Sequence, residues 1–167
     1  MIILLSTLLF THATTIDGVR SVVNNENIIS SEITIEEVIH QTDNEQERVW
    51  FHNENGAYAR LVMAAMIRTK AETLEFYIPT KEVVAARAEQ LRTDLGDSIY
   101  QQFLVANGLT NPENLLSVLR KRIIVERFVA RNIAAPTTNA DQWHHELEML
   151  LIELRTTVRE RAVTTEE

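Results

Sequence analysis

Residues Asp17–Ile33, DGVRSVVNNENIISSEI, predict a tight β-hairpin at the start of the fold. The valines of Val19–Val23 favour extended chain and mark the first strand. The polar run Asn24–Asn27 predicts the turn, and Ile28–Ile29 predicts a second, short strand.

A helix follows the hairpin directly and begins near Glu32. Ser30 or Ser31 is expected to cap it, because a serine oxygen accepts hydrogen bonds from the free N–H groups of a first helical turn. Apolar residues then recur at helical spacing as far as Ile39, and the run Gln41–Arg48 is almost wholly polar. We therefore expect a short helix and then a solvated loop.

The middle of the chain predicts four more helices, separated by Gly and Pro. The segment Gly56–Leu74 is apolar around most of its circumference, which is typical of a helix with neighbours on several sides. Pro79 breaks the chain after it. The later helices are Lys81–Leu95, ended by Gly96, a short helix after Asp97, ended by Gly108, and Glu113–Asn132, introduced by the start signal Asn111-Pro112.

Residues 141–163 predict a C-terminal helix and strand after Ala134–Ala140, a linker of turn-type residues. Five large apolar residues share one face of this helix within about 100°: Trp143, Leu147, Leu150, Leu151 and Leu154. The run Thr156–Val163 alternates as a half-buried strand does, and it is available to pair with Val19–Val23. Thr164–Glu167 is expected to fray.

The composition favours one mainly α domain. The chain has 167 residues, of which 45% are apolar, and this is enough to bury a core without disulfides; there is no Cys. A net charge of −8 opposes binding to a phosphate backbone, so we expect no nucleic-acid partner. The candidate basic patch consists of Arg120, Lys121, Arg122, Arg127 and Arg131.

The first 13 residues are typical of a signal peptide. Ile2–Phe10, IILLSTLLF, carries no charge and is too short to span a bilayer core of about 30 Å. Small residues then surround a cleavage site after Ala13. We therefore expect export to the periplasm and no stable membrane span, with a buried N-terminal strand or helix as the alternative.

Two charged residues of the last long helix, Arg122 and Glu126, fall within its apolar sector at 100° per residue. One interpretation is a polar device within a binding groove. The other is a partly buried ion pair between packed helices, and structural ion pairs of this kind are common.

The chain resembles the N-terminal module of SurA-like periplasmic chaperones, a group that shares its peptide-binding domain with PpiD and trigger factor. These proteins open with a pattern close to V-x-x-V-V-N-x-x-x-I-x-x-S-E. The residues that match it in register are Val19, Val22, Val23, Asn24, Ile28, Ser31 and Glu32. The family's later helical motifs have counterparts in Leu61–Leu74, Ile78–Val83, Ile99–Gly108 and Leu119–Arg127. The resemblance implies a helical module over residues 14–133, with a small β element formed by the N-terminal hairpin and a C-terminal strand.

One departure from the family is as informative as the match. SurA-like foldases insert one or two parvulin prolyl-isomerase domains after the last helix of the module, where this chain has only residues 134–140. A parvulin domain needs on the order of 100 residues. We therefore expect no prolyl-isomerase activity.

Nothing in the sequence predicts a catalytic, cofactor or metal site. His144 and His145 are adjacent and point about 100° apart, and either one with Glu148 supplies only two ligands. His40 and His52 lie in what reads as polar loop sequence. The chain has no Gly-rich phosphate loop and no nucleophile elbow.

The resemblance implies a chaperone that binds unfolded or extended polypeptides without ATP, with outer-membrane protein precursors as clients. The alternatives are a structural or assembly subunit, or an accessory part of a separate isomerase. A homodimer that exchanges terminal elements is a further expectation for partners. The candidate client contacts are aromatic residues beside helix breaks, with Phe76-Tyr77 and Tyr100 expected to border a groove: Trp50, Phe51, Phe76, Tyr77, Tyr100 and Phe103.

Overall fold

The computed structural model describes residues 18–43, 56–109, 111–133, 140–157 and 160–162. Within these ranges the chain is mainly helical with one small antiparallel sheet, as the sequence predicts. The helices are α1 Ser30–Thr42, α3 Gly56–Ala71, the 3₁₀ turn η2 Glu75–Tyr77, α4 Lys81–Leu95, α5 Asp97–Ala106, α6 Pro112–Asn132 and α7 Ala140–Thr157. The strands are β1 Val19–Val23, β2 Glu26–Ile29 and β3 Glu160–Ala162.

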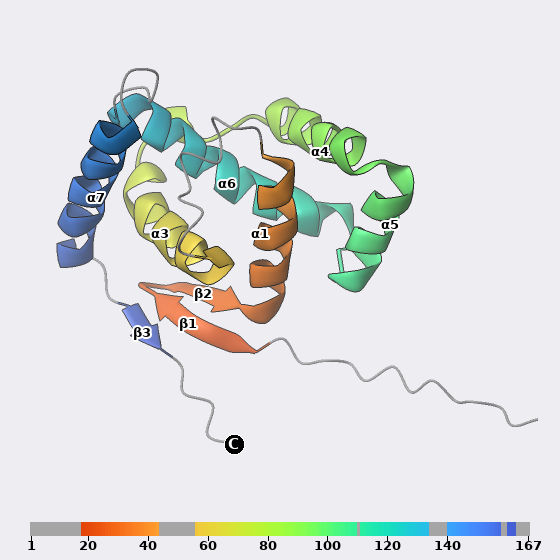
Figure 1. The fold of residues 1–167 in the computed structure, drawn as a ribbon, viewed down its shortest axis with the longest axis horizontal. Coiled ribbons are helices and arrows are strands. Elements are labelled where there is room, and N and C mark those ends of the chain that lie inside the picture. The colour runs from red at the N-terminus through yellow and green to blue at the C-terminus, as the bar shows by residue number, and fades with distance from the viewer. Residues whose placement is uncertain (1–17, 44–55, 110, 134–139, 158–159, 163–167) are drawn as a thin grey trace, which may run out of the picture.

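The two ends of the described chain meet in the sheet, whose strand order is β2-β1-β3 (Figure 1). Both pairings are antiparallel, and Val23 lies opposite Glu26 on one side and Glu160 on the other. The predicted β element of hairpin plus C-terminal strand is therefore confirmed. The hairpin turn is only Asn24–Asn25, shorter than the four residues predicted. Asn24 has a φ of 53°, a left-handed conformation that Asn tolerates better than most residues.

The predicted serine cap of α1 is wrong. The helix begins at Ser30, and the side chain of that residue holds the hairpin instead of the helix end. Ser30 Oγ donates to the carbonyl of Gly18 at 3.2 Å and accepts from Arg20 Nε at 2.9 Å. The carboxylate of Glu32 covers the helix start, since it accepts from the backbone N–H of Ile29 at 3.4 Å.

The other helix ends follow local chemistry as predicted. The side chain of Asn111 accepts from the N–H of Glu113 at 3.1 Å, and Pro112 is the first residue of α6. Gly96 and Gly108 end α4 and α5 with φ values of 76° and 65°, where a side chain would be strained.

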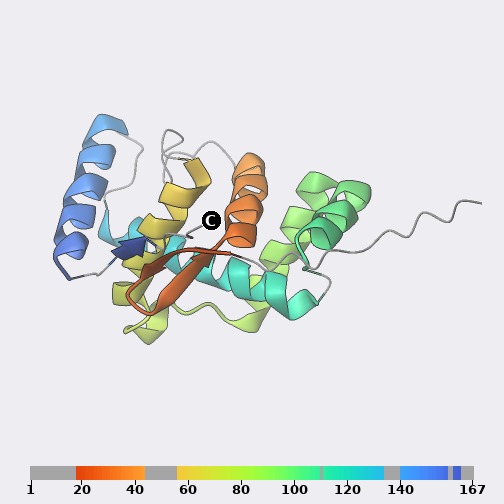
Figure 2. The same cartoon turned by 90° about the horizontal axis from the view of Figure 1, so that it is seen from below.

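Helix α6 runs along the long axis of the molecule and contributes to two separate hydrophobic cores (Figures 1 and 2). Its C-terminal half contributes Val125 and Val129 to a core shared with the sheet, α3 and α7. Its N-terminal half contributes Leu115 and Leu119 to a second core with α1, α4 and α5. As a result, α7 and α5 lie at opposite ends of the long axis of the molecule (Figures 1 and 2).

The central position predicted for Gly56–Leu74 is confirmed in α3, which ends earlier than expected, at Ala71. Ala65 and Ile67 of this helix are buried within the first core, where α3 packs against both α6 and α7. Small residues in this helix allow its neighbours to approach closely.

The C-terminal helix α7 packs against the preceding part of the chain, as the sequence predicts. Trp143, Leu147 and Leu154 are buried in the first core. The predicted strand Thr156–Val163 is shorter in the structure, because α7 continues to Thr157 and β3 covers only Glu160–Ala162. Within the described ranges, no helix has both the length and the apolar character needed to cross a bilayer.

Candidate functional site

Phe76 and Tyr77, the first pair of predicted client contacts, differ in burial although their ring centres lie only 4.0 Å apart. The Phe76 side chain is 53% exposed, with the guanidinium of Arg131 4.7 Å from its ring centre. Tyr77 is 4% exposed and packs against the ring of Phe128 at 5.1 Å. Its hydroxyl accepts a hydrogen bond from Asn132 Nδ2 at 2.8 Å. Tyr77 is thus a core residue with a satisfied hydroxyl, and only Phe76 is open to a partner.

The other predicted contacts belong to a different part of the molecule. Phe103 is buried in the second core, and Tyr100 packs against that core while half-buried. The structure therefore does not bring Tyr100 to the Phe76-Tyr77 pair, which borders the first core. Trp50 and Phe51 lie outside the described residues.

A large groove lies elsewhere, between the start of α1 and the turn that joins α5 to α6. It is open to solvent and has a volume of about 760 Å³. Its apolar lining consists of Ile29, Ile35, Ala106, Leu109 and Val118. Its uncharged polar lining consists of Ser30, Ser31, Thr34, Asn107, Asn114 and Ser117. We call this feature the α1–α6 groove.

Sequence reasoning missed the α1–α6 groove because its residues come from two regions far apart in the chain, Ile29–Ile35 and Ala106–Lys121. The available signals were two short polar runs at element ends, Ser30-Ser31 and Asn107-Gly108, and each of these reads locally as a cap or a turn. The charged groups in the lining are Glu32 and Lys121, which pair at 3.1 Å. The groove therefore presents apolar and hydroxyl or amide groups with little net charge.

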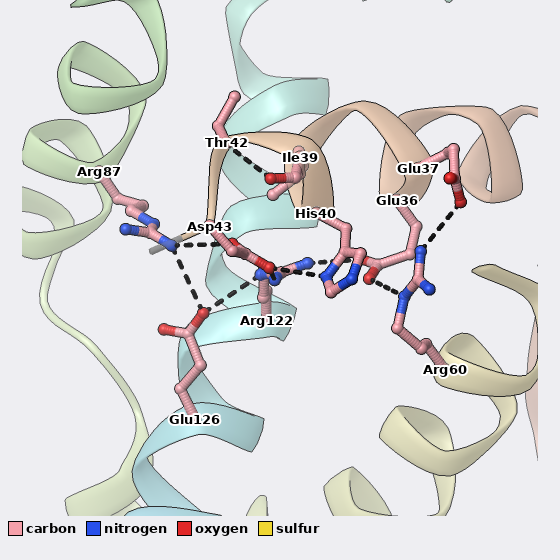
Figure 3. A network of polar contacts seen from close by, with 10 residues as sticks. All are labelled: Glu36, Glu37, Ile39, His40, Thr42, Asp43, Arg60, Arg87, Arg122 and Glu126. Atoms are coloured by element: carbon pink, nitrogen blue, oxygen red, sulfur yellow. Dashed lines mark hydrogen bonds and ion pairs between the residues drawn. The ribbon is translucent and has the colours of Figure 1, made fainter. Parts of the chain in front are cut away.

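Beside the α1–α6 groove, α1 and α6 are held together by a buried network of ion pairs centred on Arg122 (Figure 3). Arg122 Nη1 donates to Glu36 at 2.8 Å and Arg122 Nε to Glu126 at 3.2 Å. Its Nη2 donates to Asp43. Arg122 is only 6% exposed. The structural interpretation of Arg122 and Glu126, a buried ion pair between packed helices, is therefore confirmed, and Arg122 does not line the α1–α6 groove.

The network extends to α3 and α4 (Figure 3). From α3, Arg60 donates to Glu36 and to Glu37, each at 3.0 Å. From α4, the Arg87 guanidinium lies 3.6 Å from Asp43 and 3.7 Å from Glu126. The network thus connects α3, which packs in the first core, with α1 and α4 of the second core and with α6, which contributes to both.

His40 is part of this network, which corrects its assignment to a polar loop. It lies in α1, is buried, and its Nδ1 is 2.9 Å from Asp43 Oδ2. The sequence HQTD places these two residues three apart at a helix end, a signal that the loop interpretation overlooked.

Burial alone would lower the pKa of Arg122 by disfavouring its charge. The carboxylates of Glu36, Asp43 and Glu126 outweigh this effect and raise the pKa above its ordinary value. The guanidinium therefore stays charged in the interior. Desolvation of buried charges offsets most of their mutual attraction, whereas removal of one partner leaves a buried charge uncompensated.

A second ion cluster joins the hairpin to α3 and α6. Glu26 of β2 pairs with Lys121 at 3.0 Å and accepts from Arg68 Nε at 3.2 Å. Burial raises the pKa of Glu26, but Arg68 and Lys121 outweigh it, so the pKa lies below its ordinary value. Burial likewise lowers the pKa of Lys121, yet Glu26 and Glu32 raise it overall. A cavity of about 30 Å³ separates this cluster from the Arg122 network, large enough for an ordered water.

The candidate basic patch is divided among separate contacts. Lys121 and Arg122 are taken up by the ion clusters, and Arg127 donates to the carbonyl of Ile78 at 3.2 Å. Arg131 lies over Phe76 on the opposite half of α6 from Arg120. These residues do not form one continuous surface for a phosphate backbone.

The described ranges contain no group of three His, Cys, Asp or Glu residues arranged to hold a metal. His145 is exposed on α7, while the ring of His144 lies 5.5 Å from that of Trp143.

Comparisons with protein families, with curated proteins and with solved structures found no match to this chain.

Proposed function

We propose that this chain is an ATP-independent chaperone that binds unfolded or extended polypeptides in the periplasm, with outer-membrane protein precursors as clients. The observation that carries the proposal is the α1–α6 groove of about 760 Å³. Its size is within the range of sites that bury small ligands, about 300–1,000 Å³. A few residues of extended chain are of this size.

The lining of the groove suits an extended peptide better than a compact small molecule. An extended segment exposes its backbone N–H and C=O groups, and the hydroxyl and amide side chains of Thr34, Asn114 and Ser117 are of the types that donate and accept hydrogen bonds. The apolar lining residues, such as Leu109 and Val118, offer contacts that tolerate different client side chains. The balance of Glu32 and Lys121 adds no strong preference for client charge.

Exposed apolar residues on the neighbouring helix support the same use. Val105 of α5 is 68% exposed and directly precedes Ala106, which lines the groove. Ile99 of the same helix is also exposed. A chaperone for many clients needs apolar surface of this kind, which an ordinary monomer keeps small.

The test is suppression of aggregation when a urea-unfolded β-barrel membrane protein is diluted into buffer without ATP. We expect residues 14–167 to keep the client soluble, and Asn114→Trp, which fills the groove from an exposed position on α6, to weaken this several-fold. Glu148→Trp, on exposed α7 at the other end of the molecule, is the matched control and should act like the parent. No suppression by the parent chain, or equal loss in both variants, would contradict the proposal.

An assembly subunit without holdase activity is the second candidate, and a feature of α7 favours it. Met149 and Ile152 lie one turn apart on α7, and both are more than half exposed. An exposed apolar pair on one helix face suits a fixed protein contact. If this function is correct, the double variant Met149→Glu/Ile152→Glu should abolish co-purification of a defined partner while the parent suppresses no aggregation.

A further inference from the structure

A second groove lies between the first turn of α4 and the N-terminal half of α6, two helices that pack against each other. It is open to solvent and has a volume of about 540 Å³. Ser117 lines both this groove and the α1–α6 groove, so the two grooves meet on α6. We call the second one the α4–α6 groove.

The lining of the α4–α6 groove combines apolar, hydroxyl and charged side chains. The apolar residues are Pro79, Val84 and Leu116, the hydroxyl residues are Thr80 and Ser117, and the charged residues are Lys81, Arg120 and Glu113. All three charged residues are exposed. Because two cations face one carboxylate, the groove is positively charged in a chain whose net charge is −8.

The two cations of this groove are not committed to partners within the protein. In the part of the chain that the structure describes, neither the Lys81 ammonium nor the Arg120 guanidinium forms an ion pair or a hydrogen bond, in contrast to Lys121 on the same helix as Arg120. Glu82 follows Lys81 in α4, but hydrogen bonds to its own backbone N–H and to the Thr80 side chain are the main causes that hold the pKa of Glu82 below its ordinary value. A carboxylate that enters the groove therefore displaces no existing partner of the two cations.

We propose that the α4–α6 groove binds acidic side chains of an extended polypeptide whose neighbouring residues lie in the α1–α6 groove. Lys81 and Arg120 supply the complementary charge, and the hydroxyls of Thr80 and Ser117 are donors for a carboxylate. The α1–α6 groove itself has no strong preference for client charge, so the preference for Asp and Glu comes from the second groove. This inference rests on the proposed chaperone function, since the polypeptide is the client.

Two features favour a polypeptide over a small free anion. The apolar residues Pro79, Val84 and Leu116 contribute contact area for the methylene groups of an Asp or Glu residue and its neighbours, whereas a small inorganic anion gains nothing from them. The shared residue Ser117 also makes the two grooves continuous, which suits a chain that crosses α6.

Binding of labelled peptides to the full chain tests the preference. Three peptides share one unstructured sequence of Ser, Thr and Leu, are blocked at both ends and carry an uncharged dye, and they differ only in having Glu, Gln or Lys at the same positions. Fluorescence anisotropy gives each Kd. We expect the Glu peptide to bind about three- to tenfold more tightly than the Lys peptide at low salt, because exposed ion pairs contribute modestly. The preference should nearly disappear at about 0.5 M salt, which screens exposed charges.

Two single variants locate the preference. Arg120→Glu leaves Lys81 against two carboxylates in the lining and should make the Lys peptide the tighter ligand. Arg155→Glu, at an exposed position on α7 outside the groove, changes the net charge by the same amount and should keep the preference for the Glu peptide. Both variants should unfold as cooperatively as the parent, since both positions are exposed.

Equal affinity for the three peptides, or the same change in both variants, would overturn this inference whatever the aggregation assay shows. Complete displacement of the Glu peptide by inorganic phosphate at constant ionic strength would assign the groove to small anions and would also overturn it. A preference for the Glu peptide that Arg120→Glu reverses, in a chain that suppresses no aggregation, would retain the acidic-segment site and refute the chaperone function, so the two failures are distinguishable.

Discussion

Arg122 shows how a single residue can organise four helices. Its guanidinium reaches carboxylates from α1 and from its own helix, and those carboxylates in turn hold arginines of α3 and α4. The position of Arg122 on the apolar face of α6 was visible in the sequence, because helical periodicity fixes which residues point inward. Its partners were not, since Glu36 and Asp43 come from an element far away in the chain and local patterns carry no information about distant packing.

Removing Arg122 should destabilise the protein strongly. Arg122→Ala leaves Glu36 and Asp43 buried without their main cationic partner, and breaking such a pair costs about 3–5 kcal/mol. Arg120→Ala, an exposed position on the same helix, should change the free energy of unfolding by no more than about 0.5 kcal/mol. Urea unfolding at neutral pH measures both, and similar effects in the two variants would show that the network is not structurally important.

Glu26 should make stability depend on acid. Its pKa in the folded state lies below the ordinary value of 4.5, because Arg68 and Lys121 favour the carboxylate more than burial disfavours it. The stabilisation is therefore fully present above pH 4.5 and is lost as the pH falls through the lowered folded-state pKa. We expect the difference in unfolding free energy between the parent and Glu26→Gln to be constant from pH 5 to 7, roughly, and to shrink below that range. If the difference in unfolding free energy between the two proteins is the same at about pH 3 as at about pH 7, the linkage is refuted.

At the scale of elements, local chemistry predicted where most helices begin and end. The roles of these end signals can be predicted without knowledge of the fold, because each acts through its own backbone or that of a neighbouring residue. Examples are Asn111-Pro112, Gly96 and Gly108. Ser30 failed as a predicted cap for the opposite reason. Its hydroxyl has a competing partner, the carbonyl of Gly18, that is nearby only once the hairpin has formed.

Helix α7 should be essential for the first core. Deleting residues 140–167 exposes the surface that Trp143, Leu147 and Leu154 cover, and each such side chain contributes about 1.5–3 kcal/mol of burial. Their sum is comparable with the stability of a whole domain, about 5–15 kcal/mol. The truncated chain should lose cooperative thermal unfolding. Substituting the exposed residues Met149 and Ile152 of the same helix by Glu is the control and should leave the melting temperature nearly unchanged.

At the scale of the whole molecule, the mainly helical class and the closing sheet were predictable, whereas the α1–α6 groove was not. The fold class follows from composition and from the periodicity of apolar residues, and both can be read directly from the sequence. The groove depends on how the ends of β2, α5 and α6 pack together, and this packing cannot be predicted from any one stretch of consecutive residues. For the same reason, the expected grouping of Tyr100 with Phe76-Tyr77 placed residues together that belong to different cores.

We expect no catalysis of prolyl isomerisation, because the SurA-like foldases that the sequence resembles carry a parvulin domain where this chain has only residues 134–140. Uncatalysed isomerisation takes tens to hundreds of seconds at 25 °C, so even weak catalysis is visible in a short proline-containing peptide. We expect residues 14–167 to leave this rate unchanged. A rate increase that scales with protein concentration and disappears when the protein is unfolded would contradict this.

The pairing of β1 with β3 also sets an order of events during synthesis. β1 pairs with β2 across a two-residue turn, but its pairing with β3 joins Ser21–Val23 to Glu160–Ala162 and has to wait until the long segment between them has been made. Contacts between distant segments form slowly, because the chain loses the entropy of closing a long loop before the contacts contribute any stabilising energy. The sheet of this protein therefore closes late, and β1 keeps one edge unpaired until β3 joins it.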